Sequence, residues 1–195
     1  MFSVNIDKLV SMTPAESESY LDTAETILSL CEEQCRTIAV EGDALGAFKL
    51  AYAISQKGRK VLFVDADAGN EYFLSKYRLG KDLKGFTDYL VKPETDVKDL
   101  VCLTNKDEVN VMFTGDITQV GNVAGYGGRI VFMMAEVLDI YDFVVVLTAD
   151  GRGAACCGGT VIIMKRSEYS DEAADELTDR LTKAGCNVLG VIIGE

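Results

Sequence analysis

The stretch "RTIAVEGDALGAFKLAYAISQKGRKVLFVDAD", residues 36–67, contains the pattern that predicts the fold. A short apolar strand at 36–40 is followed by a segment of helical composition at 44–58 and a second apolar strand at 60–67. Gly58 stands where the C-terminal end of a helix favours glycine. A strand–helix–strand unit in one sheet is nearly always right-handed and joins parallel strands. We therefore expect a parallel sheet with a helix packed against it.

The rest of the chain continues the alternation of helices and strands. Thr13, Pro14 and Glu16 form a helix-start signal for a helix from Pro14 to about residue 34. Further helices are expected at 82–91, 129–140 and 170–185, strands at 109–115, 142–147, 160–165 and 188–194, and glycine-rich loops at 121–128 and 151–159. This order predicts an α/β fold with a three-layer, doubly wound, mostly parallel sheet. The chain 1–195 is expected to be a single domain, with 1–35 as an N-terminal helical lead-in.

Composition excludes several classes of function. The 195-residue chain has a net charge of -12, which argues against nucleic acid or an anionic membrane as the main partner. No apolar run is long enough to span a membrane, and no signal peptide is recognisable, so we expect a cytoplasmic protein. The chain contains no histidine, which excludes Ser-His-Asp and Cys-His catalysis within it.

The cysteine pattern predicts reduced thiols and no metal site. Cys31 and Cys35 are one helical turn apart, and Cys156 and Cys157 are adjacent. Zinc sites commonly use paired CxxC motifs or Cys/His combinations, and this chain has neither. We therefore interpret the six cysteines as small apolar residues of a reducing compartment.

Residues 49–67, "KLAYAISQKGRKVLFVDAD", resemble the segment NLAxxxAxxGxKVLLIDAD of the deviant Walker A (MinD/ParA-like) branch of P-loop ATPases. Within that branch the chain resembles the cytoplasmic bacterial tyrosine kinases (BY-kinases) of capsule and exopolysaccharide assembly. The supporting stretches are "ESYLDTAETIL" (18–28), "GFTDYL" (85–90), "VNVMFTGD" (109–116), "IYDFVVV" (140–146) and "AGCNVLGVIIG" (184–194). The resemblance covers residues 15–194 and implies a P-loop NTPase-like domain.

The phosphate-binding loop departs from the family pattern. A phosphate loop of the form GxxxxGK[ST] binds phosphates with glycine amides and a lysine, and its hydroxyl binds Mg²⁺. Here Gly42 and Gly46 are four positions apart rather than five, Asp43 falls in the lysine slot, and Ala44 falls in the hydroxyl slot. Residual cofactor contacts are therefore limited to Gly42, Asp43 and Ala44. An Asp43 carboxylate is expected to cap the helix and to compete with phosphate for its free amides.

Other functional positions of the family are also altered. Asp65 and Asp67 match the Walker A′ acids, which the resemblance assigns to Mg²⁺ and the attacking hydroxyl, but Leu147 replaces the Walker B acid. Leu21 and Ala24 replace both arginines of the ring-forming ExxRxxR helix. We also expect this chain to lack the C-terminal tyrosine cluster that the resemblance assigns to autophosphorylation. No catalytic residue is therefore predicted beyond the residual Asp65 and Asp67, and no bound metal or cofactor is expected.

Three functional hypotheses follow. The first is a catalytically inactive pseudoenzyme that binds or regulates a protein partner in capsular or exopolysaccharide assembly. That partner would be a membrane-anchored polysaccharide co-polymerase or a paralogous kinase, which could recruit the chain to the inner face of the membrane. The second is an active ATP-dependent tyrosine kinase or ATPase, with ATP and Mg²⁺ held by Asp65, Asp67, Lys49 and Arg152. The third is a different ligand pocket formed by the loops 121–128 and 151–159, with Cys156 and Cys157 facing a thiophilic ligand.

Overall fold

A computed structural model describes residues 3–31, 35–69, 72–77, 83–92, 94–116, 118 and 123–194. Its strands are β1 (Ser3–Val4), β2 (Thr37–Gly42), β3 (Val61–Asp65), β4 (Val101–Thr104), β5 (Val109–Met112), β6 (Phe143–Leu147), β7 (Gly159–Lys165) and β8 (Val188–Gly194). Its helices are α1 (Pro14–Leu30), α2 (Ala44–Gln56), α3 (Tyr72–Tyr77), α4 (Phe86–Val91), α5 (Gly127–Leu138), α6 (Gly151–Ala154) and α7 (Asp171–Lys183), with the 3-10 turns η1 (Val97–Asp99) and η3 (Val123–Tyr126).

The strands form one sheet in the order β1-β4-β5-β3-β6-β2-β7-β8. All neighbours from β5 to β8 pair in parallel, whereas β4 is antiparallel to β5. Strand β6 lies between β2 and β3, so the crossover through α2 passes over one intervening strand. The predicted doubly wound, mostly parallel sheet is confirmed.

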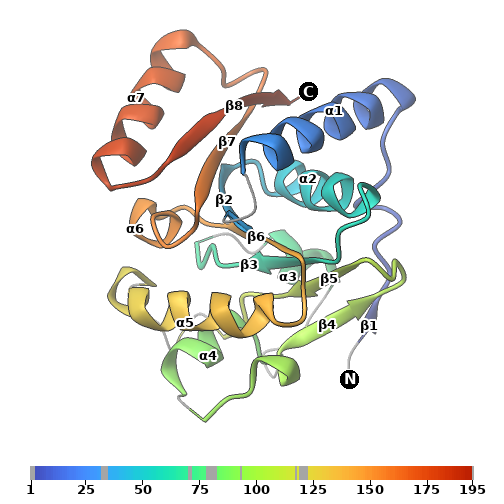
Figure 1. Cartoon of the computed structure of the whole chain (residues 1–195), viewed down its shortest axis with the longest axis vertical. Coiled ribbons are helices and arrows are strands. Elements are labelled where there is room, and N and C mark those ends of the chain that lie inside the picture. Colours follow the sequence, from blue (N-terminus) through green and yellow to red (C-terminus); the bar gives the residue numbers. More distant parts are fainter. Residues whose placement is uncertain are drawn as a thin grey trace.

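Helices cover both faces of the sheet and produce three layers (Figure 1). Helices α1 and α2 pack on one face, and α4, α5, α6 and α7 lie on the other. Successive residues of β6 alternate between these layers: Val145 and Leu147 join the core beneath α1 and α2, while Val144 and Val146 join the core beneath α4 and α5. Period-two alternation in a strand with both faces covered explains why the whole strand is apolar.

Helix α1 begins as the sequence predicts. The Thr13 hydroxyl accepts the amide of Glu16 at 3.2 Å, and the Glu16 carboxylate accepts the amide of Thr13 at 2.8 Å, which forms a complete capping box. The helix ends at Leu30, earlier than the predicted residue 34, because the Cys31 backbone leaves helical geometry as the C-cap. Residues 32–34 lie outside the described part of the chain.

Several elements differ from the sequence prediction. The segment 151–159 is a loop only in part: it begins with α6, where the Asp150 carboxylate caps the helix by accepting the amide of Arg152 at 3.0 Å, continues through turns at 155–158, and ends at the start of β7. Helix α5 starts at Gly127, two residues earlier than predicted, and part of the predicted loop 121–128 forms η3. Strands β1 and β4 and helix α3 were not predicted, because elements of two to six residues are too short to show a clear periodicity.

Candidate functional site

The junction between β2 and α2, where a P-loop would lie, is a single residue. Strand β2 continues through Glu41 and Gly42, which pair with Ile162 and Ile163 of β7, and α2 begins at Ala44. The Asp43 amide donates to the carbonyl of Ile163 at 2.9 Å, so sheet pairing extends to the start of the helix. Because the backbone of these residues bonds to β7, it does not form a loop that could fold around a phosphate.

Gly42 permits this tight junction. Its φ of 117° lies in a region that residues with a side chain rarely adopt, and a Cβ at this position would lie 2.0 Å from the backbone oxygen of Ile163. Gly42 therefore allows the backbones of β2 and β7 to approach each other closely at this junction.

Replacement of Gly42 with alanine is expected to lower the free energy of unfolding by roughly 3 kcal/mol, because both the backbone conformation and the contact are strained. Gly58→Ala is the matched control, because Gly58 also has a positive φ, 78°, but a Cβ added there would meet nothing within 4 Å. Denaturant unfolding of both variants checks this account. Equal losses in the two variants would show that contact with β7 is not the cause.

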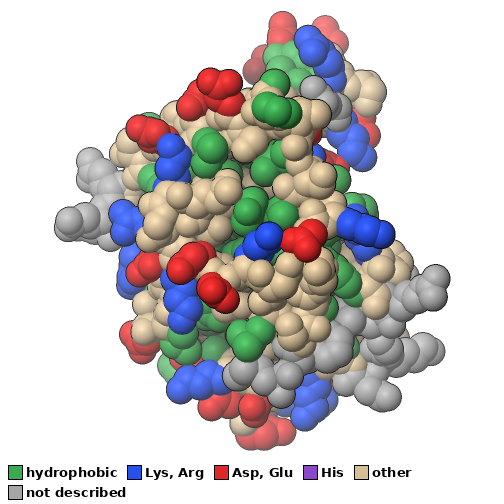
Figure 2. Space-filling model, turned by 90° about the vertical axis from the view of Figure 1, so that its right-hand side faces the viewer, with side chains coloured by type: hydrophobic (Ala, Val, Ile, Leu, Met, Phe, Trp, Pro, Cys, Tyr) green, Lys and Arg blue, Asp and Glu red, His purple; other side chains and the backbone are tan. Residues whose placement is uncertain are grey.

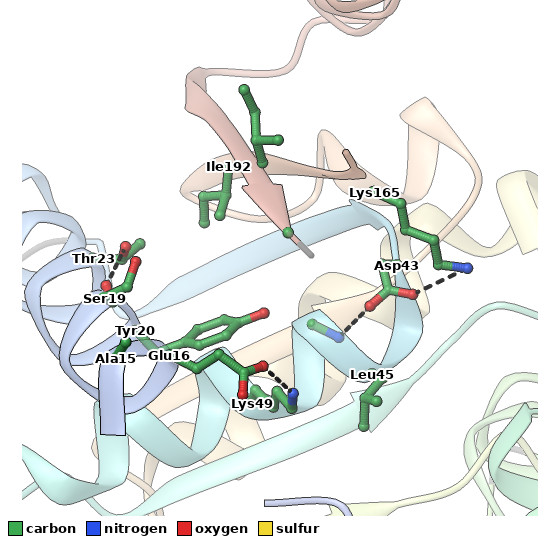
Figure 3. A pocket seen from close by; sticks show the side chains of 13 residues that line it. Ala15, Glu16, Ser19, Tyr20, Thr23, Asp43, Leu45, Lys49, Lys165 and Ile192 are labelled. Carbon is green, nitrogen blue, oxygen red and sulfur yellow. Dashed lines mark hydrogen bonds and ion pairs between the residues drawn. The ribbon is translucent and has the colours of Figure 1, made fainter. Parts of the chain in front are cut away.

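The Asp43 carboxylate occupies the N-terminus of α2 (Figure 3). One of its oxygens accepts the amide of Gly46 at 2.6 Å, and the other lies 3.6 Å from the ammonium of Lys165 on β7. The predicted capping role of Asp43 is confirmed. A free helix N-terminus attracts phosphate because its amides lack partners. Here the protein's own carboxylate takes up that position and carries the same sign of charge as a phosphate.

Asp43→Ala is expected to lower the free energy of unfolding by about 1 kcal/mol, the usual loss for an N-cap. Asp43→Asn should lower the free energy of unfolding by only roughly a few tenths of 1 kcal/mol, because asparagine caps helices about as well as aspartate. Chemical denaturation of the two variants in parallel measures the difference. If the two variants lose the same stability, the cap is not the main contribution of Asp43.

Glu41 adds a second acidic group at the same junction. Its side chain is buried and forms an ion pair with Arg180 of α7, while its second oxygen, Oε2, has no hydrogen-bond partner among the described residues. Burial raises the pKa of Glu41, and the neighbouring Arg180 offsets part of that rise. Lys165 and Arg180 lie far from residues 41–43 in the sequence. The sequence around residues 41–43 therefore could not predict these two ion pairs.

Asp65 and Asp67, the residual catalytic candidates, are in different environments. Asp65 is fully buried at the end of β3, and neither carboxylate oxygen has a well-formed hydrogen bond within the described ranges. Burial raises the pKa of Asp65 to about 7, and the nearby charge of Asp67 adds to the rise, while the Thr114 hydroxyl opposes it. Asp67 is half-buried, and its carboxylate accepts the amide of Gly69 at 3.0 Å.

Leu147 is a core residue at the end of β6, the strand that lies between β2 and β3. It is 1% exposed, and the sheet register places it beside Asp65 of β3 and Val40 of β2. Its side chain belongs to the apolar cluster beneath α1 and α2. The prediction that Val144–Val146 form a buried strand is confirmed, and Leu147 extends that strand's packing to its last residue.

The residues at this junction do not fit Mg²⁺ and ATP. A magnesium ion needs several oxygen ligands in near-octahedral geometry. Ala44 and Leu147 supply no side-chain oxygen, and Asp43 stands at the helix terminus that would receive a phosphate. Within the described part of the chain, no group of three or more Cys, Asp and Glu side chains is arranged to hold a metal ion.

The structure does not bring the four residues of a rebuilt nucleotide site together. Lys49 forms an ion pair with Glu16 of α1 at 2.9 Å, and the Lys49 side chain is 13% exposed, so it neither faces solvent nor points to a free anion. Arg152 is exposed on α6, which packs on the opposite face of the sheet from α2. The ion pair between Lys49 and Glu16 therefore links α2 to α1 and leaves Lys49 no part in a nucleotide site with Arg152.

Helix α1, which resembles in sequence the ring-forming helix of bacterial tyrosine kinases, packs inward at positions 21 and 24. Ala24 is fully buried and Leu21 packs against the same core, whereas Glu18 is exposed. An arginine at position 24 would have to place its charge in the apolar layer between α1 and the sheet. The two apolar replacements therefore stabilise the packing of α1 on this domain.

Two cavities lie along α1, on the side facing β8. The first has a volume of about 300 Å³ and lies between α1, the start of α2 and the ends of β7 and β8; its polar lining includes Ser19, Tyr20, Asp43, Lys49 and Lys165 (Figure 3). The second, of about 410 Å³, is lined by α1, Val161 and residues 189–192. Neither cavity is lined by Asp65, Asp67 or Leu147, nor by the described residues of the segments 121–128 and 151–159.

The surface gives no indication of a nucleic-acid site on the side shown in Figure 2. Acidic, basic and apolar side chains are intermixed there, and the coloured Lys and Arg side chains do not gather into one broad patch. None of the helices in the described ranges combines the length and the apolar character needed to cross a membrane.

The fold is that of P-loop NTPases of the MinD/ParA branch. The septum site-determining protein MinD from Pyrococcus horikoshii, solved with Mg-ADP, superimposes with a TM-score of 0.58 and 17% identity, over 80% of this chain and 70% of that one. The relationship to tyrosine kinases is more extensive. The chain is 21% identical over 193 residues to the tyrosine-protein kinase CpsD of Streptococcus agalactiae, which covers 92% of this chain and 84% of the relative.

Solved structures extend this likeness. The chimerical protein CapA2B2 superimposes with a TM-score of 0.81 and 18% identity, over 98% of this chain and 92% of that chain. The kinase domain of the Escherichia coli tyrosine kinase ETK gives a TM-score of 0.79 and 20% identity, over 91% and 74%. No protein-family model matches the chain. The predicted resemblance to bacterial tyrosine kinases is confirmed.

Proposed function

We propose that this chain is a catalytically inactive relative of the bacterial tyrosine kinases, a single degenerate P-loop NTPase-like domain that acts as a binding or regulatory protein. The observation that carries the proposal is the Asp43 carboxylate at the N-terminus of α2. It takes the amide that a phosphate would need and repels the phosphate's charge. Repulsion between unit charges about 4 Å apart costs on the order of 4 kcal/mol near a protein surface, and the ion pair of Asp43 with Lys165 offsets part of that cost.

The second support is the concerted change at the positions that serve catalysis in the family. The hydroxyl and Walker B positions hold Ala44 and Leu147, and Leu147 is buried in the core. Lys49, the nearest lysine on α2, is engaged with Glu16. We infer that no nucleotide or metal cofactor is needed for the function of this chain.

The function is proposed to lie in capsular or exopolysaccharide assembly, on the basis of the likeness to CpsD. A membrane-anchored polysaccharide co-polymerase is the partner we favour, and a paralogous kinase is the second candidate. Either partner would bring the chain to the inner face of the membrane. Exposed apolar side chains are available for such a contact: Val131 and Phe132 of α5 are 54% and 59% exposed.

A phosphotransfer assay separates this proposal from an active enzyme with a rebuilt site. The purified chain is incubated with radiolabelled ATP, Mg²⁺ and a tyrosine-containing acceptor peptide, beside the double variant Asp65→Asn/Asp67→Asn. We expect background transfer from both proteins, because the Asp43 carboxylate holds the helix terminus that a phosphate would need and Leu147 offers no oxygen to a metal ion. Transfer by the wild-type chain that is lost in the double variant would overturn the proposal, because it would assign Asp65 and Asp67 a catalytic role.

A further inference from the structure

Cys31 and Cys35 are placed for direct reaction with each other. Cys31 is the C-cap of α1, Cys35 lies just before β2, and their sulfur atoms are 2.9 Å apart. All six cysteines of the chain are free thiols in this structure. Among the described residues, no other pair of cysteine sulfurs makes such a contact: the Cys156 thiol faces backbone carbonyls, and the Cys102 thiol faces the carbonyl of Leu103.

We propose that Cys31 and Cys35 form a reversible intramolecular disulfide, a redox modification site at the end of α1. The oxidant is a small-molecule disulfide of the glutathione class. This inference does not depend on the proposed loss of kinase activity, because neither cysteine belongs to the junction at Asp43.

The two thiols have different roles in the reaction. Cys31 is 3% exposed, and burial raises the pKa of its thiol to about 12, which suppresses its thiolate. Cys35 is only half-buried, so its thiolate attacks the small-molecule disulfide first and releases one small thiolate. Cys31 then loses its proton, attacks the sulfur of Cys35 and expels the second small thiolate. In sum, two protein thiols and one small disulfide give one protein disulfide and two small thiols.

The link would tie the C-cap of α1 to the segment just before β2. Helix α1 forms one wall of both cavities, and the Leu30 side chain next to Cys31 lines the second cavity. Oxidation is therefore expected to restrain this wall and to stabilise the folded chain by closing a short loop. A melting-temperature rise of roughly 5 °C corresponds to a loop of this size.

The chain offers a direct readout, because trypsin cleaves after Lys8 and Arg36 and leaves both cysteines in one peptide, residues 9–36. The folded wild-type protein is treated with oxidised glutathione, alkylated, digested and analysed by mass spectrometry. We expect this peptide to be lighter by two hydrogen atoms and protected from alkylation at both cysteines, with both effects reversed by dithiothreitol. The melting temperature of the oxidised protein should rise at the same time.

Three variants identify the linkage. Cys35→Ser should lose the cross-link, and Cys31→Ser should hold Cys35 as a mixed disulfide with glutathione. Cys102→Ser, a buried cysteine in β4, should behave as wild type. Cys157 lies close enough to Cys35 to interact with it electrostatically, so the competing outcome is a cross-link between peptide 9–36 and the peptide that carries Cys157. That product, or continued alkylation of both Cys31 and Cys35 in the oxidised wild-type protein, would overturn the proposal even if a variant fails to fold.

Discussion

Replacing Asp65 with asparagine is expected to change how stability depends on pH. Asp65 is buried without a charge partner, and its pKa in the folded protein is raised from 3.8 to about 7. Between these two values the folded state holds a proton that the unfolded state has lost. The stabilising contribution is therefore fully present below about pH 4 and is lost as pH rises towards and through 7. A difference of about three pKa units corresponds to about 4 kcal/mol.

Asparagine mimics the neutral acid but cannot ionise, so Asp65→Asn should remove this dependence. We expect the stability of the variant relative to wild type to increase by about 4 kcal/mol between pH 4 and pH 8, measured by denaturant unfolding at several pH values. Asp67→Asn is the matched control, because it removes a charge that raises the pKa of Asp65 and should shift the transition to lower pH without abolishing it. A stability difference that stays constant with pH would contradict the account of Asp65 as a buried, protonated acid.

Restoring an acid at position 147 is expected to destabilise the protein severely. Leu147→Asp removes a leucine that is 1% exposed and places a second carboxylate directly across the strand pair from Asp65. Loss of leucine packing costs about 2–5 kcal/mol, and an unpaired buried acid adds to the loss. We expect the free energy of unfolding to fall by about 5 kcal/mol at pH 7, a large fraction of the stability of a typical domain.

Leu147→Met is the matched control, because it nearly preserves volume and apolar character and should cost less than about 1.5 kcal/mol. Thermal and denaturant unfolding of both variants should be measured with and without millimolar Mg²⁺. Recovery of the Leu147→Asp variant by Mg²⁺ would contradict our interpretation, because it would show that the ligands for a metal ion are still in place. Equal stability of the two variants would contradict it as well.

The sequence predicted most of the sheet and the altered character of the junction. The alternation of apolar strands with capped helices defined the doubly wound fold, and the Asp43 side chain caps α2 as expected. Leu147 was predicted to keep its packing role, and it is buried. These features depend on residues that are close in sequence, or on strand periodicity, and both are visible without a structure.

The remaining features depend on long-range contacts. Lys165 and Arg180 form ion pairs with Asp43 and Glu41 from β7 and α7, more than 100 positions away in the chain. The pairing of Gly42 with Ile163, which leaves no room for a phosphate loop, is equally distant. The difference between Asp65 and Asp67 arises because β3 ends at Asp65, a boundary that sequence patterns place only within a few residues.

The most direct test of the central claim is isothermal titration of ATP and ADP, each with Mg²⁺, into the wild-type chain, beside a bacterial tyrosine kinase domain as a positive control. We expect no saturable heat up to millimolar nucleotide, because Asp43 holds the helix terminus and Leu147 offers no ligand for a metal ion. Saturable binding with a dissociation constant in the micromolar range would contradict it and would show that a nucleotide site survives at the junction of β2 and α2.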